Sequence, residues 1–96
     1  MAAYLIADID VREPERYKAY VESVPVLIAK HGGTYRVRGG EATTLEGEWS
    51  PARLIVLEFP DRAAALAFYN DPEYAPFKTL RQSVTDTQLV LAEGHG

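Results

Sequence analysis

The chain has 96 residues, 47% of them hydrophobic and 25% charged, and it contains no cysteine. These values predict one folded domain, 1–96, and they exclude a disulfide framework, a thiol nucleophile and a thiolate metal site. Fourteen acidic against ten basic residues give a net charge of −4, which argues against nucleic-acid binding because phosphate is recognised by clustered Lys and Arg.

The N-terminus lacks the basic region and long apolar run of a signal peptide, and no segment is long enough to cross a bilayer. We therefore expect a cytoplasmic protein without a membrane partner. The two histidines are far apart and have no ligand spacing with carboxylates, so neither a metal site nor a cofactor is expected.

The first two predicted elements are a strand and a helix. Side chains alternate over Ala3–Val11, which predicts a strand with one apolar face and one mixed face. Apolar residues at helical spacing then predict a helix that begins at Glu13-Pro14 and ends at Gly32-Gly33. Pro25 lies inside this helix and is expected to kink or split it, because proline has no N–H to donate.

Glycine pairs bracket a short second strand, Thr34–Arg38. Strict alternation directs Tyr35 and Val37 to one face of this strand, and Thr34, Arg36 and Arg38 to the other. A further short strand is predicted over 41–49, with a turn at Glu46-Gly47.

The second half of the chain repeats the order of strand, helix and strand. The strand at 53–59 carries Ile55, Leu57 and Phe59 on one side, and Asp61 caps the helix at 63–69 that follows. Asp71-Pro72 begins another helix, which extends to Val84. A last strand is expected over 87–92, followed by a loose tail.

The resulting β-α-β-β-α-β order is that of the ferredoxin-like α+β fold, in which both helices cover one face of a four-stranded antiparallel sheet. The other face remains open. It carries Tyr4, Ile6, Leu54 and Val56, which is more apolar surface than a small monomer usually exposes. We therefore expect a homodimer that packs two open faces together as a dimeric α/β barrel.

Four charged residues are assigned to the same open face: Asp8, Arg36, Arg38 and Glu58. In one interpretation they form a buried ion-pair network between subunits. In the other they line a pocket, where Arg38 binds an anionic substrate and Glu58 or Asp8 acts as general base. The sequence leaves both interpretations open.

Other candidate site residues are weaker. Trp49 is interpreted as an aromatic lid or an interface contact, and Tyr74 as a possible ligand contact in the first turn of a helix. His31 ends the first helix, where interaction with the helix dipole competes with ligand binding. Arg81 is expected to pair with a carboxylate such as Glu46 or Glu73.

The chain resembles the domain-of-unknown-function 1330 family over nearly its whole length. The resemblance lies in the order and spacing of Tyr4-Leu5-Ile6-Ala7, Tyr17/Tyr20, His31-Gly32-Gly33, Arg38-Gly39-Gly40, Leu45-Glu46-Gly47, Arg53, Glu58-Phe59-Pro60, Tyr69, Asp71-Pro72-Glu73-Tyr74 and Arg81. It implies the dimeric α/β-barrel superfamily, which includes monooxygenases and isomerases, and it implies no particular reaction.

Two functions are carried forward. The first is a small cofactor-independent enzyme, an isomerase or monooxygenase-like protein that acts on a small anionic or aromatic molecule. In that enzyme Arg38 and Arg36 hold the ligand, Glu58 or Asp8 moves a proton, and Tyr4 and Trp49 shape the cavity. The second is a non-catalytic dimeric module that binds a metabolite or a protein partner.

Overall fold

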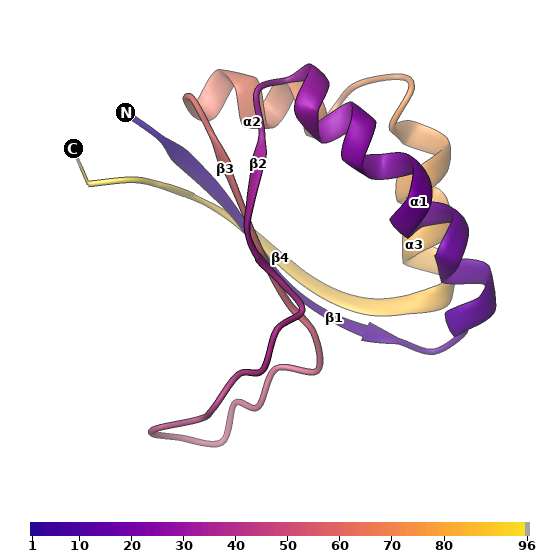
Figure 1. Cartoon of the computed structure of the whole chain (residues 1–96), viewed down its shortest axis with the longest axis vertical. Helices are drawn as coiled ribbons and strands as arrows, with labels where there is room; N and C mark the ends of the chain where they lie inside the picture. Colours follow the sequence, from indigo (N-terminus) through magenta and orange to yellow (C-terminus); the bar gives the residue numbers. More distant parts are fainter. Residues whose placement is uncertain (96) are drawn as a thin grey trace.

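The computed structural model describes residues 1–95 and confirms the predicted ferredoxin-like order. Four strands, β1 (Ala3–Val11), β2 (Thr34–Arg38), β3 (Leu54–Phe59) and β4 (Thr85–Glu93), form an antiparallel sheet in the order β2-β3-β1-β4. Three helices, α1 (Pro14–Lys30), α2 (Arg62–Tyr69) and α3 (Ala75–Val84), lie on one side of this sheet (Figure 1). Among residues 1–95, no helix is both long and apolar enough to cross a membrane.

The core lies between the sheet and the helices. It is built from the strand residues that alternation assigns to the helix-facing side and from the apolar stripes of the helices. Phe59 and Phe68 stack with ring centres 5.6 Å apart, and Phe68 also contacts Tyr74 at 4.5 Å. These large aromatic contacts join β3, α2 and the start of α3 into one packed unit.

The helices differ in how closely they approach the sheet. The short helix α2 packs against β1, β3 and β4, whereas α1 packs mainly against α3. Asp61 caps α2 as predicted, accepting a hydrogen bond of 2.7 Å from the backbone N–H of Ala64. Because α1 stands farther from the sheet than α2, the space between α1 and the sheet is bounded by side chains.

Three details of the predicted elements are wrong. The predicted split of the first helix at Pro25 does not occur: α1 continues through the proline, since Val24, Leu27 and Ile28 on either side of it are held in the core. Helix α3 begins at Ala75, because Asp71 folds the preceding residues into a separate turn. The predicted strand at 41–49 is absent from the sheet.

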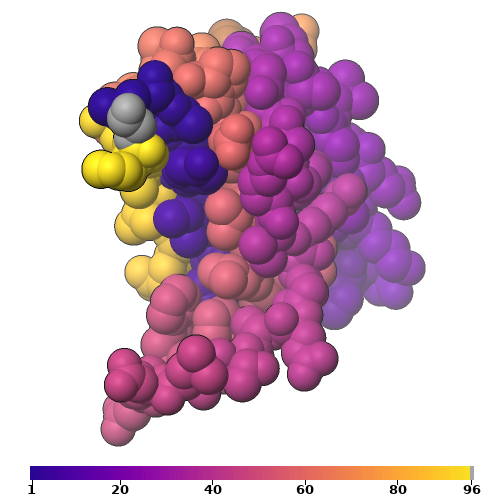
Figure 2. Space-filling model, turned by 60° about the vertical axis from the view of Figure 1, so that its left-hand side comes forward, coloured from indigo at the N-terminus to yellow at the C-terminus, as the bar shows by residue number. Residues whose placement is uncertain are grey.

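Residues 40–52 instead form an irregular arm that extends away from the body of the molecule (Figures 1 and 2). It carries Leu45, whose exposed fraction is 89%, and Trp49, which is 62% exposed. The Thr44 hydroxyl donates a hydrogen bond of 2.7 Å to the carbonyl of Trp49 and so joins the two sides of the arm. The segment joins neither edge of the sheet, which ends in β2 on one side and in β4 on the other.

Candidate functional site

A β-bulge in β2 decides where its arginines point. Tyr35 lies opposite Leu57 and Val37 lies opposite Val56, so one extra residue, Arg36, is inserted between two successive positions of β3. Arg38 then lies opposite Ile55, on the face that the helices cover. The prediction that Arg38 shares the open face with Arg36 is therefore wrong, because strict alternation does not hold across a bulge.

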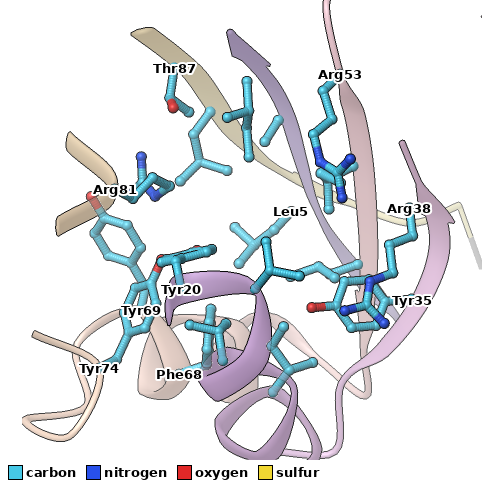
Figure 3. Close-up of a pocket in the computed structure, with 18 of the residues that line it drawn as sticks. Leu5, Tyr20, Tyr35, Arg38, Arg53, Phe68, Tyr69, Tyr74, Arg81 and Thr87 are labelled. Atoms are coloured by element: carbon cyan, nitrogen blue, oxygen red, sulfur yellow. The ribbon is translucent and has the colours of Figure 1, made fainter. Parts of the chain in front are cut away.

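Arg38 and Tyr35 lie at the mouth of a cavity between the sheet and the helices (Figure 3). The cavity volume, counted over positions that the centre of a water molecule can occupy, is about 60 Å³. This space holds roughly five waters, which occupy ~150 Å³ as liquid, the size of a cavity that accepts benzene. Its wall is apolar apart from one threonine, three arginines and five tyrosines: Arg38, Arg53, Arg81, Tyr17, Tyr20, Tyr35, Tyr69 and Tyr74.

Two of the arginines, Arg38 and Arg53, lie on the same side of the cavity (Figure 3). The Arg38 guanidinium is exposed and lies 4.3 Å from the centre of the Tyr35 ring, a cation–π contact. Arg53 is half-buried, and its Nε is buried without a hydrogen-bond partner among residues 1–95. Gly39 makes room for it, since a Cβ at that position would lie 2.7 Å from Nη1 of Arg53.

The third arginine lies at the other end. Arg81 is buried, with an exposed fraction of 4%. The hydroxyls of Tyr20 and Tyr74 are joined by a hydrogen bond of 2.7 Å, and their proximity raises the pKa of Arg81 against the opposing effect of burial. The predicted ion pair of Arg81 with Glu46 or Glu73 is absent from the described residues, so that prediction is wrong.

All the charged side chains in the cavity wall are positive. None of its three arginines forms an ion pair within residues 1–95, and no carboxylate is part of the wall. Burial raises the pKa values of Tyr17, Tyr20 and Tyr35, so these phenols stay protonated at neutral pH. The cavity therefore presents cations and hydrogen-bond donors to any ligand.

The predicted catalytic carboxylates lie elsewhere. Glu58 lies on the open face opposite Tyr4, where its Oε1 pairs with Nε of Arg36 at 3.3 Å. Asp8 lies four residues farther along β1, about 13 Å from Tyr4 at the usual rise of a strand. The structure does not bring Glu58, Asp8 and Arg38 together, because two of them are far apart and the third faces the cavity.

Asp8 anchors the arm to the sheet. Its carboxylate accepts hydrogen bonds of 2.9 Å from Nε1 of Trp49 and from the backbone N–H of Ala52. The bond from Trp49 is the main reason that the pKa of Asp8 lies below its usual value. Trp49 and Tyr4 lie outside the cavity wall, so the prediction that they shape the same cavity as Arg38 is wrong.

His31 joins two helical segments. It follows the last residue of α1, and its Nε2 lies 2.8 Å from Oδ2 of Asp71 in the turn before α3. Nζ of Lys30 contacts the same oxygen at 2.9 Å. His31 is not part of the cavity wall, and its position fits the structural interpretation. Among residues 1–95 no cluster of three or more potential metal ligands is present.

Of the predicted ligand contacts, the cavity wall contains Arg38 and Tyr74 and excludes Arg36, Tyr4, Trp49 and His31. Sequence reasoning assigned no binding role to Arg53, Tyr20 or Tyr35, which line the same cavity. The only signal for Arg53 and Tyr20 was their place in the family resemblance. Hydrophobic periodicity shows only which residues of a strand or helix face the interior. It does not distinguish a residue that fills the core from one that lines a cavity.

Residues 2–95 match the family described as Domain of unknown function (DUF1330). A protein of unknown function from Rhodopseudomonas palustris is similar in structure, with a TM-score of 0.81 and 19% identity over 99% of this chain and 83% of that chain. SnoaB, a cofactor-independent oxygenase from Streptomyces nogalater, has a TM-score of 0.63 and 14% identity over 99% and 94%.

A putative antibiotic biosynthesis monooxygenase from Nitrosomonas europaea has a TM-score of 0.60 and 15% identity, with 100% of both chains covered. No curated protein gives a significant match to the chain. At these identities, the similarity to the solved structures shows a shared fold alone.

Proposed function

We propose that this chain, which belongs to the family described as Domain of unknown function (DUF1330), binds a small organic anion in its arginine-lined cavity and acts on it as a cofactor-independent enzyme of the oxygenase or isomerase type. The observation that carries the binding is a cavity wall with three arginines and no carboxylate. Desolvated guanidiniums without a counter-charge are costly, and an anionic ligand offsets that cost.

The size and the wall of the cavity define the ligand. Apolar side chains between the arginines, such as Leu5 and Leu57, favour a hydrocarbon or aromatic body. Tyr35 and Phe68 add ring surfaces on which a flat molecule can pack. A molecule the size of benzoate fits these requirements.

The groups in the cavity wall favour stabilisation of an anion over abstraction of a proton by the protein. A proton-abstracting base is absent from the wall of the cavity, where the titratable groups are arginines and tyrosines. Cations and donors lower the pKa of an acidic group on a bound substrate and stabilise an enolate or phenolate. The site therefore suits a reaction that proceeds from an anionic substrate. A structural neighbour described as a cofactor-independent oxygenase supports this assignment.

The same lack of a base favours a second candidate, a non-catalytic dimeric module that binds a metabolite. The two candidates share the anion site and differ in turnover. Incubation of the protein with a metabolite extract, followed by mass spectrometry, distinguishes them. An enzyme converts a compound at a rate that Arg53→Gln lowers, whereas a binding module only retains it.

We further propose that a second copy of the chain covers the open sheet face. Val90, near the middle of β4, points away from the helices and is 59% exposed, and it lies opposite Ile6 of β1. Together with Val56 and Val37 these residues make an apolar surface that a small monomer rarely leaves in water.

Isothermal titration with benzoate and with benzamide, its neutral counterpart, tests the anion site. We expect benzoate to bind at least about tenfold more tightly than benzamide, and the preference to disappear in Arg53→Gln. The matched control is Arg62→Gln, which removes an exposed arginine from α2 outside the cavity. Equal binding of the two compounds, or loss of binding in the control, would refute the anion site.

A further inference from the structure

The arginines of the cavity form two separate positive poles. Arg38 of β2 lies opposite Ile55 of β3, Ile55 lies opposite Ala7 of β1, and Ala7 lies opposite Leu89 of β4. This row crosses the whole sheet, and its three strand spacings place the ends about 14 Å apart. Arg81 belongs to α3, which leads directly into β4, so it approaches the cavity from the edge opposite Arg38.

Figure 3 shows the same separation between the side chains. Arg38 and Arg53 lie together on one side of the cavity, Arg81 lies on the other, and Leu5 stands between them. The first pole is open to solvent through Arg38, whereas Arg81 is 4% exposed. A ligand that enters past Arg38 therefore reaches Arg81 with its far end.

The second pole is built to receive a negatively charged oxygen. The hydrogen bond between the Tyr20 and Tyr74 hydroxyls uses one of their two protons, which leaves the pair a second proton to donate. Tyr17 stacks on the Tyr20 ring with centres 5.3 Å apart and fixes its orientation. Arg81 adds a full positive charge that carboxylates within residues 1–95 do not neutralise.

We infer that the natural ligand is a dianion with two acidic oxygen groups, usually carboxylates, at opposite ends of a short apolar body. This inference rests on the proposed anion site and adds the substrate class. A monoanion held by Arg38 and Arg53 leaves Arg81 buried without a counter-charge, whereas a dianion compensates both poles. The apolar side chains between the poles disfavour a ligand with charge at its centre.

Isothermal titration with matched pairs of ligands tests this inference. The dicarboxylates from succinate to suberate are compared with monocarboxylates of the same length, and terephthalate is compared with benzoate. We expect one length of dicarboxylate to bind at least about tenfold more tightly than its monocarboxylate partner. Shorter and longer members of the series bind more weakly, because the distance between the poles is fixed by the sheet.

Variants of the second pole identify the group that recognises the second charge. Tyr20→Phe keeps the ring and removes the hydroxyl, and Arg81→Gln removes the charge. We expect both to lower dicarboxylate affinity more than monocarboxylate affinity, so that the preference for the dicarboxylate disappears. If Arg81→Gln unfolds, as measured by circular dichroism, Tyr20→Phe alone decides the test.

The possible outcomes separate this inference from the proposed function. If monocarboxylates bind through Arg53 and dicarboxylates gain nothing, the anion site stands and the dianion inference is overturned. If Tyr20→Phe leaves the preference for a dicarboxylate unchanged, the inference is also overturned. If no carboxylate of either kind binds, both the dianion inference and the anion site fail.

Discussion

The guanidinium of Arg38 lies 4.3 Å from the centre of the Tyr35 ring, although the two residues are three positions apart in one strand. In a regular strand, residues three apart point to opposite faces of the sheet. The extra residue of the bulge, Arg36, brings them to the same face and separates the two arginines of β2. One arginine therefore serves the cavity while the other pairs with Glu58 on the open face.

Alanine substitutions of these two arginines have different effects. We expect Arg38→Ala to weaken benzoate binding about tenfold at low salt, through the loss of a charge-assisted contact. Arg36→Ala leaves benzoate affinity unchanged and lowers the free energy of unfolding by less than about 1 kcal/mol, because its ion pair with Glu58 is exposed. Titration calorimetry and urea unfolding measure both effects. Equal losses of affinity in the two variants would contradict the assigned faces.

Gly39 connects the bulged strand to the cavity. Its φ of +70° lies in the left-handed region, and an added Cβ would meet the guanidinium of Arg53. We expect Gly39→Ala to lower the free energy of unfolding by about 1–2 kcal/mol and to weaken benzoate binding by displacing Arg53. In the control Gly40→Ala, the new Cβ meets nothing within 4 Å, so both quantities stay near those of the unmodified protein.

Asp8 holds the arm through Trp49, the one tryptophan of the chain. We expect Asp8→Ala to shift the Trp49 fluorescence to longer wavelength and to speed cleavage of the arm by a glutamate-specific protease, because two hydrogen bonds to the arm are lost. Asp10→Ala, on the same strand and face, is the control. An unchanged spectrum and cleavage rate in Asp8→Ala would show that other contacts hold the arm.

Asp71 makes stability depend on pH in acid. Its contacts with His31 and Lys30 hold its folded-state pKa well below the usual 3.8. A lowered pKa adds stability that is fully present above 3.8 and is lost as the pH falls from there toward the folded-state value. We expect thermal unfolding across this range to show a smaller loss of stability in Asp71→Asn. The exposed Glu48→Gln retains the full loss, and a loss of the same size in both variants would exclude Asp71 as its source.

Val90 tests the proposed dimer. We expect Val90→Glu to convert the protein to a monomer in light scattering after size-exclusion chromatography, because a charge in an apolar interface is costly. Val26→Glu changes a valine of similar exposure on α1, on the side away from the open face, and keeps the dimer. A dimer that survives Val90→Glu and dissociates in Val26→Glu would place the interface on the helices.

The sequence by itself determined the order of elements, the helix-facing residues of the strands and the family. Alternation in β1 and β3 places Leu5 and Leu57 in the core correctly. A strand with one apolar face turns that face toward the helices, so the pattern determines which residues are buried. The same reasoning separated the open face, with Tyr4 and Ile6, from the covered one. Which face of a strand is apolar depends on that strand alone, so hydrophobic periodicity in the sequence shows it directly.

Only the tertiary structure decided where the candidate site lies. The bulge at Arg36 depends on how β2 pairs with β3, so it leaves no mark in the periodicity of the strand itself. Arg53, which directly precedes β3, and Arg81 of α3 line one cavity because α1 stands away from the sheet. A pattern within one element cannot show which residues of other elements lie opposite it. For this reason, alternation alone predicts the carboxylates of the open face as partners of Arg38.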